Sequence, residues 1–162
     1  KIVAYGPETM TLMTAGRIET SASPAQPVAT FGDAIALREA TCRWSGADQI
    51  TVDLAWETRT PIPGQPTIFT HWLDATGALD AQADGAALRG LYPPADWQPG
   101  EVIRENRVIE DATAPEGQVG VGLWSPTQNA RWPAHDATGQ PLPDQTYRLP
   151  PCNAAPERGS QP

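Results

Sequence analysis

The stretch QITVDLAWET, residues 49–58, decides the fold class. Its apolar side chains fall on every second residue, with Ile50, Val52, Leu54 and Trp56 on one face. Period-two alternation places successive side chains on opposite faces of a β-strand. The stretch therefore predicts a strand with one buried face and one face in water.

Most other apolar segments carry the same signal, and none repeats apolar residues at helical spacing over a long stretch. Further strands are predicted near residues 35–44, 67–74, 78–84, 101–109, 118–125, 130–132 and 146–149. For the Ala-rich segment that ends at Asp84, an edge strand is favoured and a short helix is the alternative, which Gly77, Gly85 and Gly90 disfavour. The pattern predicts an all-β fold, a two-sheet antiparallel β-sandwich (immunoglobulin-like or jelly-roll-like) with about eight or nine strands.

The 18 prolines and 14 glycines fall mostly between the apolar runs and suggest how the chain is divided. Residues 1–27 form an N-terminal arm with candidate strands at 2–5 and 10–13, residues 28–149 form the sandwich, and residues 150–162 form a Pro-rich tail. At 162 residues the chain has the usual size of one domain. Because it begins at Lys1 without a signal-like segment, we expect a fragment or a processed product.

The charge balance excludes one class of partner. The chain has 11 basic and 19 acidic residues, a formal net charge of -8. Such a surface repels the phosphates of nucleic acids, so no nucleic acid is expected as a partner. No run approaches the roughly 20 apolar residues of a membrane-spanning helix.

The two cysteines, Cys42 and Cys152, are the only indication of compartment. Cys42 lies at the end of a predicted strand and Cys152 in the Pro-rich tail. A disulfide between them would close a long loop and fix a loose end, as in proteins of oxidising compartments. Two buried thiols are the alternative.

An ordered series of short stretches resembles one known module. The series comprises Phe31-Gly32-Asp33 with Ile35 and Leu37, residues 52–56, residues 68–74 with Gly77, Tyr92-Pro93 with residues 97–102, and residues 121–124. It is similar to the C-terminal β-sandwich of bacterial membrane glycosyltransferase-like proteins, those resembling protein O-mannosyltransferases and lipid-linked-sugar transferases, over residues 28–142. Two departures are Glu105, where the module more often has Asp, and Gly117, where an aromatic residue commonly begins the strand.

The resemblance implies an extracytoplasmic location and an accessory role. The transferase chemistry would then belong to a membrane-embedded remainder of the protein, which would also be this domain's partner and its tether to the membrane.

Nucleophilic catalysis is not predicted, because a triad needs a nucleophile, a base and an orienting acid. The only imidazoles are His71 and His135, and no Gly-x-Ser-x-Gly turn is present. His71 lies on the same strand face as Phe69 and Leu73 and is expected to be a hydrogen-bonded core histidine. His135 lies in a predicted loop, before Asp136.

The acidic residues offer two weak candidates for chemistry. Asp96 and Glu101, which flank Trp97, are the pair to inspect for glycoside hydrolysis, although 19 acids make some such pair inevitable. Asp74, Asp80 and Asp84 are weak candidates for calcium, but their spacing fails the EF-hand pattern. Solvation of a hairpin explains them more simply, and no metal or other cofactor is expected.

The six tryptophans are the feature most open to a binding role, because sugars pack on aromatic faces. Trp56 is expected in the core, and Trp72 fits either a core or a surface position. The predicted ligand-binding residues lie in or beside two Pro-rich loops: Tyr92, Asp96, Trp97, Gln98, Arg131 and Trp132. The alternative is that Trp97 closes one end of the sandwich and fixes its loop.

The sequence thus predicts a non-catalytic extracytoplasmic accessory domain of a membrane glycosyltransferase-like protein, with glycan or lipid-linked sugar as the expected contact. The alternatives are a free-standing carbohydrate-binding module, a structural or protein-interaction domain and, least favoured, a glycoside hydrolase.

Overall fold

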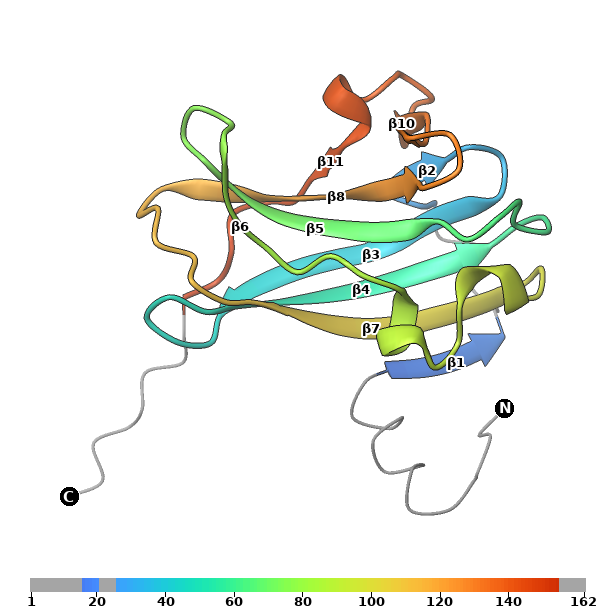
Figure 1. Cartoon of the computed structure of the whole chain (residues 1–162), viewed down its shortest axis with the longest axis horizontal. Coiled ribbons are helices and arrows are strands. Elements are labelled where there is room, and N and C mark those ends of the chain that lie inside the picture. Colours follow the sequence, from blue (N-terminus) through green and yellow to red (C-terminus); the bar gives the residue numbers. More distant parts are fainter. Residues whose placement is uncertain (1–15, 21–25, 155–162) are drawn as a thin grey trace, which may run out of the picture.

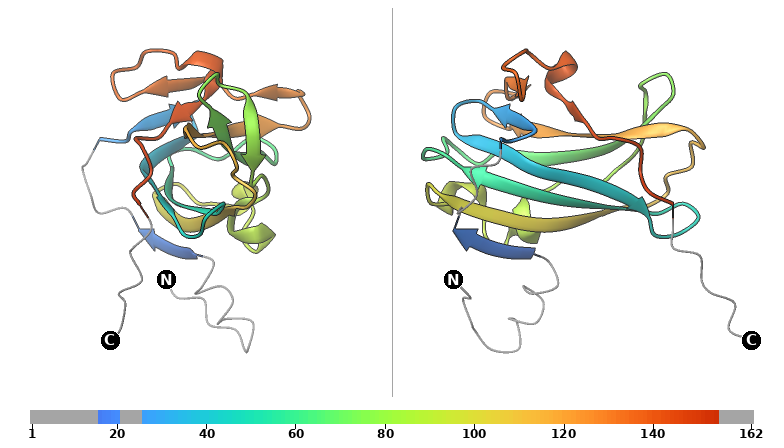
Figure 2. Two further views of the ribbon diagram at one scale, coloured as in Figure 1. Left: turned by 90° about the vertical axis from the view of Figure 1, so that its left-hand side faces the viewer. Right: turned by 180° about the vertical axis from the view of Figure 1, so that it is seen from behind.

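The computed structural model describes residues 16–20 and 26–154. Its strands form two antiparallel sheets packed face to face, which confirms the predicted β-sandwich (Figures 1 and 2). The six-stranded sheet has the order β1 (Gly16–Thr20), β7 (Glu101–Ile109), β4 (Ile50–Thr58), β3 (Ile35–Trp44), β2 (Ala29–Phe31) and β10 (Ala134–Asp136). The five-stranded sheet has the order β11 (Tyr147–Arg148), β8 (Gly117–Ser125), β5 (Thr67–Asp74) and β6 (Leu79–Gln82), and β9 (Ala130–Arg131) also pairs with β8. Three short 3₁₀ helices complete the described elements: η1 (Ala87–Gly90), η2 (Pro94–Asp96) and η3 (Pro143–Gln145).

The core lies between the two sheets. The apolar face of β4 is buried there as predicted, and Trp56 is fully inaccessible to solvent. Opposite it, the five-stranded sheet contributes Ile68, Trp72, Val119, Val121 and Leu123. Trp72 is therefore a core residue, and its indole N–H donates to the carbonyl of Ala114 at 3.2 Å.

The outer face of the five-stranded sheet carries a second, smaller apolar layer. Phe69 and Leu73 are buried there outside the main core cluster, and His71 between them is only partly buried. His71 forms a hydrogen bond as expected, with Asp84 at 3.1 Å, but its expected position in the core is wrong, because Ile68 and Trp72 occupy the inner face of β5 instead. Gly122 makes this layer possible, since a Cβ at that position would lie 2.3 Å from the Phe69 ring.

Three short strands add to the predicted set. β2 and β10 pair with each other through three residues each, with His135 in β10 rather than in a loop. β1 lies within the segment that the sequence analysis assigns to an N-terminal arm, and it pairs with β7. The candidate strands at 2–5 and 10–13 lie outside the described residues. The Ala-rich segment forms the edge strand β6, as favoured over a helix.

Of the two alternatives for the cysteines, the structure has the disulfide: Cys42 is bonded to Cys152 across 110 residues of sequence. The backbone beside it is paired as well: Asn153 N donates to Cys42 O at 3.0 Å, and Trp44 N donates to Asn153 O at 2.9 Å. The start of the Pro-rich tail is therefore attached to β3. The remainder of that tail, from residue 155, lies outside the described residues.

Candidate functional site

The two tryptophans predicted to contact a ligand are buried. Trp97 is 2% exposed and Trp132 is 8% exposed, so neither ring presents a face on which a sugar could stack. The Trp97 indole N–H donates to Tyr92 O at 2.9 Å, which locks the Pro-rich loop around the inserted ring. Trp132 packs over the turn at Gly32, where a Cβ would lie 3.3 Å from the indole. The structure thus contradicts the sugar-stacking role for these rings, and Trp97 fits the alternative of closing the end of the sandwich.

The polar residues of the same loop bind one another. The Tyr92 hydroxyl donates to Glu101 Oε2 at 2.7 Å and also lies 3.0 Å from Asp96 O. Burial raises the pKa of the Tyr92 phenol, and its hydrogen bond to Glu101 raises it further. Glu101 also accepts from Gln98 N at 3.0 Å, while the side chains of Asp96 and Gln98 are exposed. Of the two carboxylates considered for hydrolysis, Glu101 therefore stabilises the conformation of the loop by accepting these hydrogen bonds.

Arg131 belongs to a different part of the molecule. Its guanidinium lies 4.6 Å from the centre of the Phe69 ring and donates to Asp144 O at 2.9 Å and Thr146 Oγ1 at 3.0 Å. The segment after β8 lies at the upper right of Figure 1, whereas the loop between β6 and β7 lies at the lower right. The six predicted ligand-binding residues therefore do not form one site.

A buried ion pair behind that loop was not predicted. Glu105 and Arg107 both face the interior from β7, with Oε1 of Glu105 3.3 Å from Nε of Arg107. Glu105 accepts the indole N–H of Trp56 at 3.0 Å and the N–H of Leu88 at 2.9 Å. Arg107 donates to three backbone carbonyls of the loop, those of Ala83, Gly85 and Ala86.

This ion pair has a structural consequence for η1. Leu88 and Arg89 adopt left-handed backbone angles, with φ of 49° and 56°, which residues other than glycine rarely adopt. Such a conformation persists only where its surroundings impose it. The burial of Leu88 and its hydrogen bond to Glu105 supply that constraint.

The three acidic residues considered for calcium each accept hydrogen bonds from a different segment of the chain. Asp80 accepts from Thr113 N at 2.7 Å and Ala114 N at 3.0 Å, and thereby attaches β6 to the loop before β8. Asp84 accepts from Thr70 N at 2.9 Å and lies 3.1 Å from Nε2 of His71. Asp74 caps the turn that follows β5. Among the described residues, no group of three or more His, Cys, Asp or Glu side chains is placed to hold a metal ion.

The second imidazole, His135, has no orienting acid in Asp136. The Asp136 carboxylate accepts from Thr138 N at 2.8 Å, Thr138 Oγ1 at 2.7 Å and Gln140 N at 3.0 Å. These bonds, led by that from the Thr138 hydroxyl, lower the pKa of Asp136 and fold its own turn.

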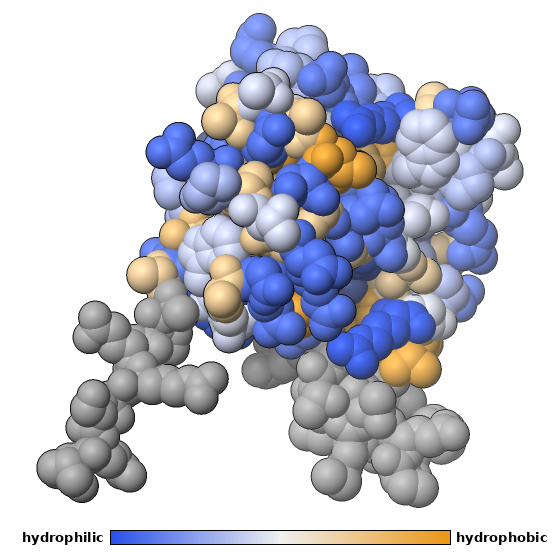
Figure 3. Space-filling view, turned by 60° about the vertical axis from the view of Figure 1, so that its left-hand side comes forward, coloured by the Kyte–Doolittle hydropathy of each residue, from blue (hydrophilic) through white to orange (hydrophobic). Residues whose placement is uncertain are grey.

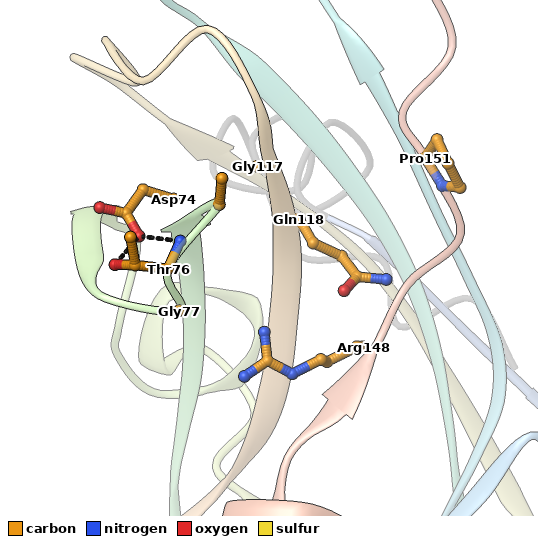
Figure 4. A pocket seen from close by; sticks show the side chains of 8 residues that line it. Asp74, Thr76, Gly77, Gly117, Gln118, Arg148 and Pro151 are labelled. Atoms are coloured by element: carbon orange, nitrogen blue, oxygen red, sulfur yellow. Dashed lines mark hydrogen bonds between the residues drawn. The ribbon is translucent and has the colours of Figure 1, made fainter.

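A polar pocket of about 390 Å³ lies at the other end of the sandwich, beside the turn between β5 and β6 (Figure 4). Its lining comes from Asp74, Ala75, Thr76, Gly77, Gly117, Gln118, Arg148 and Pro151. The surface of this end is predominantly hydrophilic (Figure 3). The volume of the pocket lies within the range of small-molecule sites, roughly 300–1,000 Å³.

Asp74 shapes one wall of this pocket through its own turn. Its Oδ1 accepts from Thr76 Oγ1 at 2.6 Å, Thr76 N at 2.8 Å and Ala78 N at 2.9 Å. These bonds, that from the Thr76 hydroxyl first, lower the pKa of Asp74 and keep it ionised near neutral pH. Gly77 follows with φ of 86°, a value that favours glycine.

Arg148 is the charged group of the pocket without a partner. Its side chain is exposed and forms no hydrogen bond or ion pair within residues 16–20 and 26–154. Neighbouring Gln118 donates its amide N–H to Leu149 O at 2.6 Å, which leaves the amide oxygen free to accept. The pocket thus combines an available cation with available acceptors, and we take it as the candidate functional site.

No family model, no curated protein and no solved structure matches this chain. The compartment follows from the covalent structure instead, because a disulfide of this kind indicates an oxidising, extracytoplasmic environment. Within the described part of the chain, no helix has the length and hydropathy of a membrane span.

The pocket could not be predicted from the sequence because its residues lie in four separate segments. Only the register of β8 between β5 and β11 brings them together, with Asp74 opposite Gly117 and Arg148 opposite Gly120. The turn signal at residues 74–77 was visible in the sequence, but nothing there identified Arg148 as its neighbour.

Proposed function

We propose that this chain is a non-catalytic, extracytoplasmic accessory domain that binds glycan for a membrane glycosyltransferase-like protein, through the pocket around Arg148. The observation that carries the proposal is the convergence of the free Arg148 guanidinium with the Gln118 amide at one pocket. Polar groups that converge in a pocket are the usual basis of ligand recognition. The disulfide supports the extracytoplasmic location, and the resemblance described above supplies the transferase.

The disulfide also contributes to the pocket itself. Pro151 forms part of the pocket wall and directly precedes Cys152, which is bonded to β3. Between Arg148 and Pro151, Leu149 is fully buried and its N–H donates to Val119 O at 2.9 Å. Two anchors in the segment that follows Arg148 hold this wall of the pocket in shape before a ligand arrives, which lowers the entropic cost of binding.

A glycan array tests the binding part of the proposal. The oxidised chain should bind a subset of bacterial surface glycans, and Gln118→Ala should lose that binding. Gln98→Ala is the matched control, because Gln98 is an exposed glutamine of the loop that sequence analysis favoured and also donates to a backbone carbonyl. Binding to no glycan, or loss of binding in Gln98→Ala alone, would contradict the proposal.

The coding sequence upstream of Lys1 tests the accessory part. Several membrane-spanning helices there would support the association with a membrane transferase. A signal peptide followed by a hydrolase domain would contradict it and favour a free-standing carbohydrate-binding module.

A further inference from the structure

The cations of the described chain differ in whether they have partners. On the outer face of the six-stranded sheet, Arg38 pairs with Glu57, Arg43 with Asp53 and Arg104 with Glu39. Arg107 and Arg131 bind carbonyl oxygens in addition to their other contacts. Arg148 makes no such contact with the described residues, yet it stands at a pocket. A guanidinium left free beside a cavity is available to a ligand.

The geometry around Arg148 supplies hydrogen-bond acceptors as well as donors. The Gln118 amide nitrogen is turned toward the segment after β11, where it donates to Leu149 O, and its oxygen lies on the side of Arg148 (Figure 4). Thr76 uses its hydroxyl hydrogen on Asp74, which leaves oxygen lone pairs able to accept. Acceptors of this kind take hydrogen bonds from ligand hydroxyl groups.

The carboxylate of Asp74 does not occupy Arg148. One of its oxygens accepts all three bonds from its own turn, and the other points away from Arg148 (Figure 4). The hydrogen bonds of the Asp74 carboxylate are therefore made within its own turn. The guanidinium remains free to pair with an external anion.

From these contacts we infer that the pocket binds a hydroxylated carboxylate, such as the uronic acid unit of an acidic glycan; the inference rests on the proposed function. The planar guanidinium of Arg148 matches a carboxylate through two parallel N–H···O bonds. The hydroxyl groups of the same sugar donate to Gln118 and Thr76. The Pro151 ring lines the pocket and offers an apolar surface to the sugar's C–H groups.

Isothermal titration of the oxidised chain with sodium glucuronate, glucose and sodium acetate tests this inference. Glucuronate should bind with a Kd on the order of 1 mM, as befits one small sugar in an open pocket. Arg148→Gln should weaken that binding by at least about tenfold, the usual worth of a charge-assisted hydrogen bond. Arg59→Gln is the control, because Arg59 is also an exposed arginine without a partner among the described residues but lies outside the pocket.

The comparison of ligands separates the possible failures. If glucose binds as tightly as glucuronate, or Arg148→Gln binds glucuronate like the wild type, the acidic specificity is wrong while a glycan-binding function stands. If acetate binds as tightly as glucuronate, the sugar does not contribute and the inference is wrong. If glucuronate does not bind but the array detects Gln118-dependent neutral glycans, the inference fails alone. If neither assay detects binding, the proposed function fails with it.

Discussion

Reduction of the Cys42–Cys152 disulfide should lower the free energy of unfolding by about 5 kcal/mol. The bridge joins residues 110 apart, so it closes the chain from the end of β3 through β11 into one covalent loop. In the chain-entropy treatment a loop of this length removes about 16 cal/mol/K from the unfolded ensemble, which is about 5 kcal/mol at 25 °C. That is a large share of the roughly 5–15 kcal/mol by which domains are stable.

The reduced chain should nevertheless remain folded in dilute buffer. Leu149 stays buried in the core, and its N–H still donates to Val119 O. Local loosening should be confined to the residues that follow Leu149, where the N–H of Asn153 donates to Cys42 O. Amide hydrogen exchange at Cys152 and Asn153 should therefore quicken before exchange in β4 does.

Urea unfolding followed by tryptophan fluorescence measures the effect, with and without dithiothreitol. The double variant Cys42→Ala/Cys152→Ala is the control, because its unfolding midpoint should match that of the reduced wild type and should not respond to reductant. A change of less than about 1 kcal/mol on reduction would refute the account, since it would mean that the bridge does not constrain the unfolded chain.

Two further substitutions test the polar contacts of the structure. Arg107→Met leaves Glu105 buried without its counter-ion and should destabilise the fold by about 3–5 kcal/mol in urea unfolding. When Glu105→Leu is added to Arg107→Met, part of this stability should be recovered. If the double variant instead loses the sum of the two single losses, the ion pair is contradicted. Burial alone would raise the pKa of Asp84, but hydrogen bonds from His71 and Thr70 N lower it below its ordinary value of 3.8. A depressed pKa contributes stability that is present above the unfolded value and lost as the pH falls through the folded value. The stability difference between the wild type and Asp84→Asn should thus be largest near neutral pH and shrink below about pH 4, and a difference that stays constant over this range would contradict it.

The long strands were predictable because each carries its signal locally. β5 and β7 have the predicted bounds, and β4 begins one residue later than expected. Alternation over eight or nine residues fixes both the strand and its two faces. β2 and β10 escaped prediction because three residues are too few for any periodicity, and they exist through their pairing, β2 with β3 and β10 with β2.

Which face of a strand is buried could not be predicted when both faces are apolar. β5 carries Ile68 and Trp72 on one side and Phe69 and Leu73 on the other. The outer side is buried because the chain after β8 returns over it: a Cβ at Gly120 would lie 2.8 Å from Thr146. This contact joins residues that are far apart in the sequence, so the alternation of side chains within β5 cannot predict it.

The inward charges of β7 were unpredictable for a similar reason. Alternation alone places Glu105 and Arg107 on the same face as Ile103 and Ile109, which marks that face as mixed. Only the loop backbone above it, whose carbonyls and N–H groups need partners, turns the charges into a satisfied network. Glu105 is also one of the two departures from the resembled module, and its carboxylate reaches both Trp56 and Leu88.

The candidate site is the feature for which the structure differs most from the sequence-based prediction. Aromatic residues in Pro-rich loops suggested a stacking surface, but prolines also hold a loop rigid enough to insert its indole into the core, as Trp97 does. The pocket that replaces it depends on strand register and on the disulfide-fixed tail. Neither of these is encoded in a short motif.

The most direct test of the central claim is a titration of the ¹⁵N-labelled, oxidised chain with sodium glucuronate, followed by NMR. The pocket account predicts progressive, saturable shifts of the backbone amides of Thr76, Gly77 and Gln118 and of the Arg148 side-chain N–H, with residues 92–100 unchanged. Shifts confined to residues 92–100, or no saturable shift at the pocket, would contradict it.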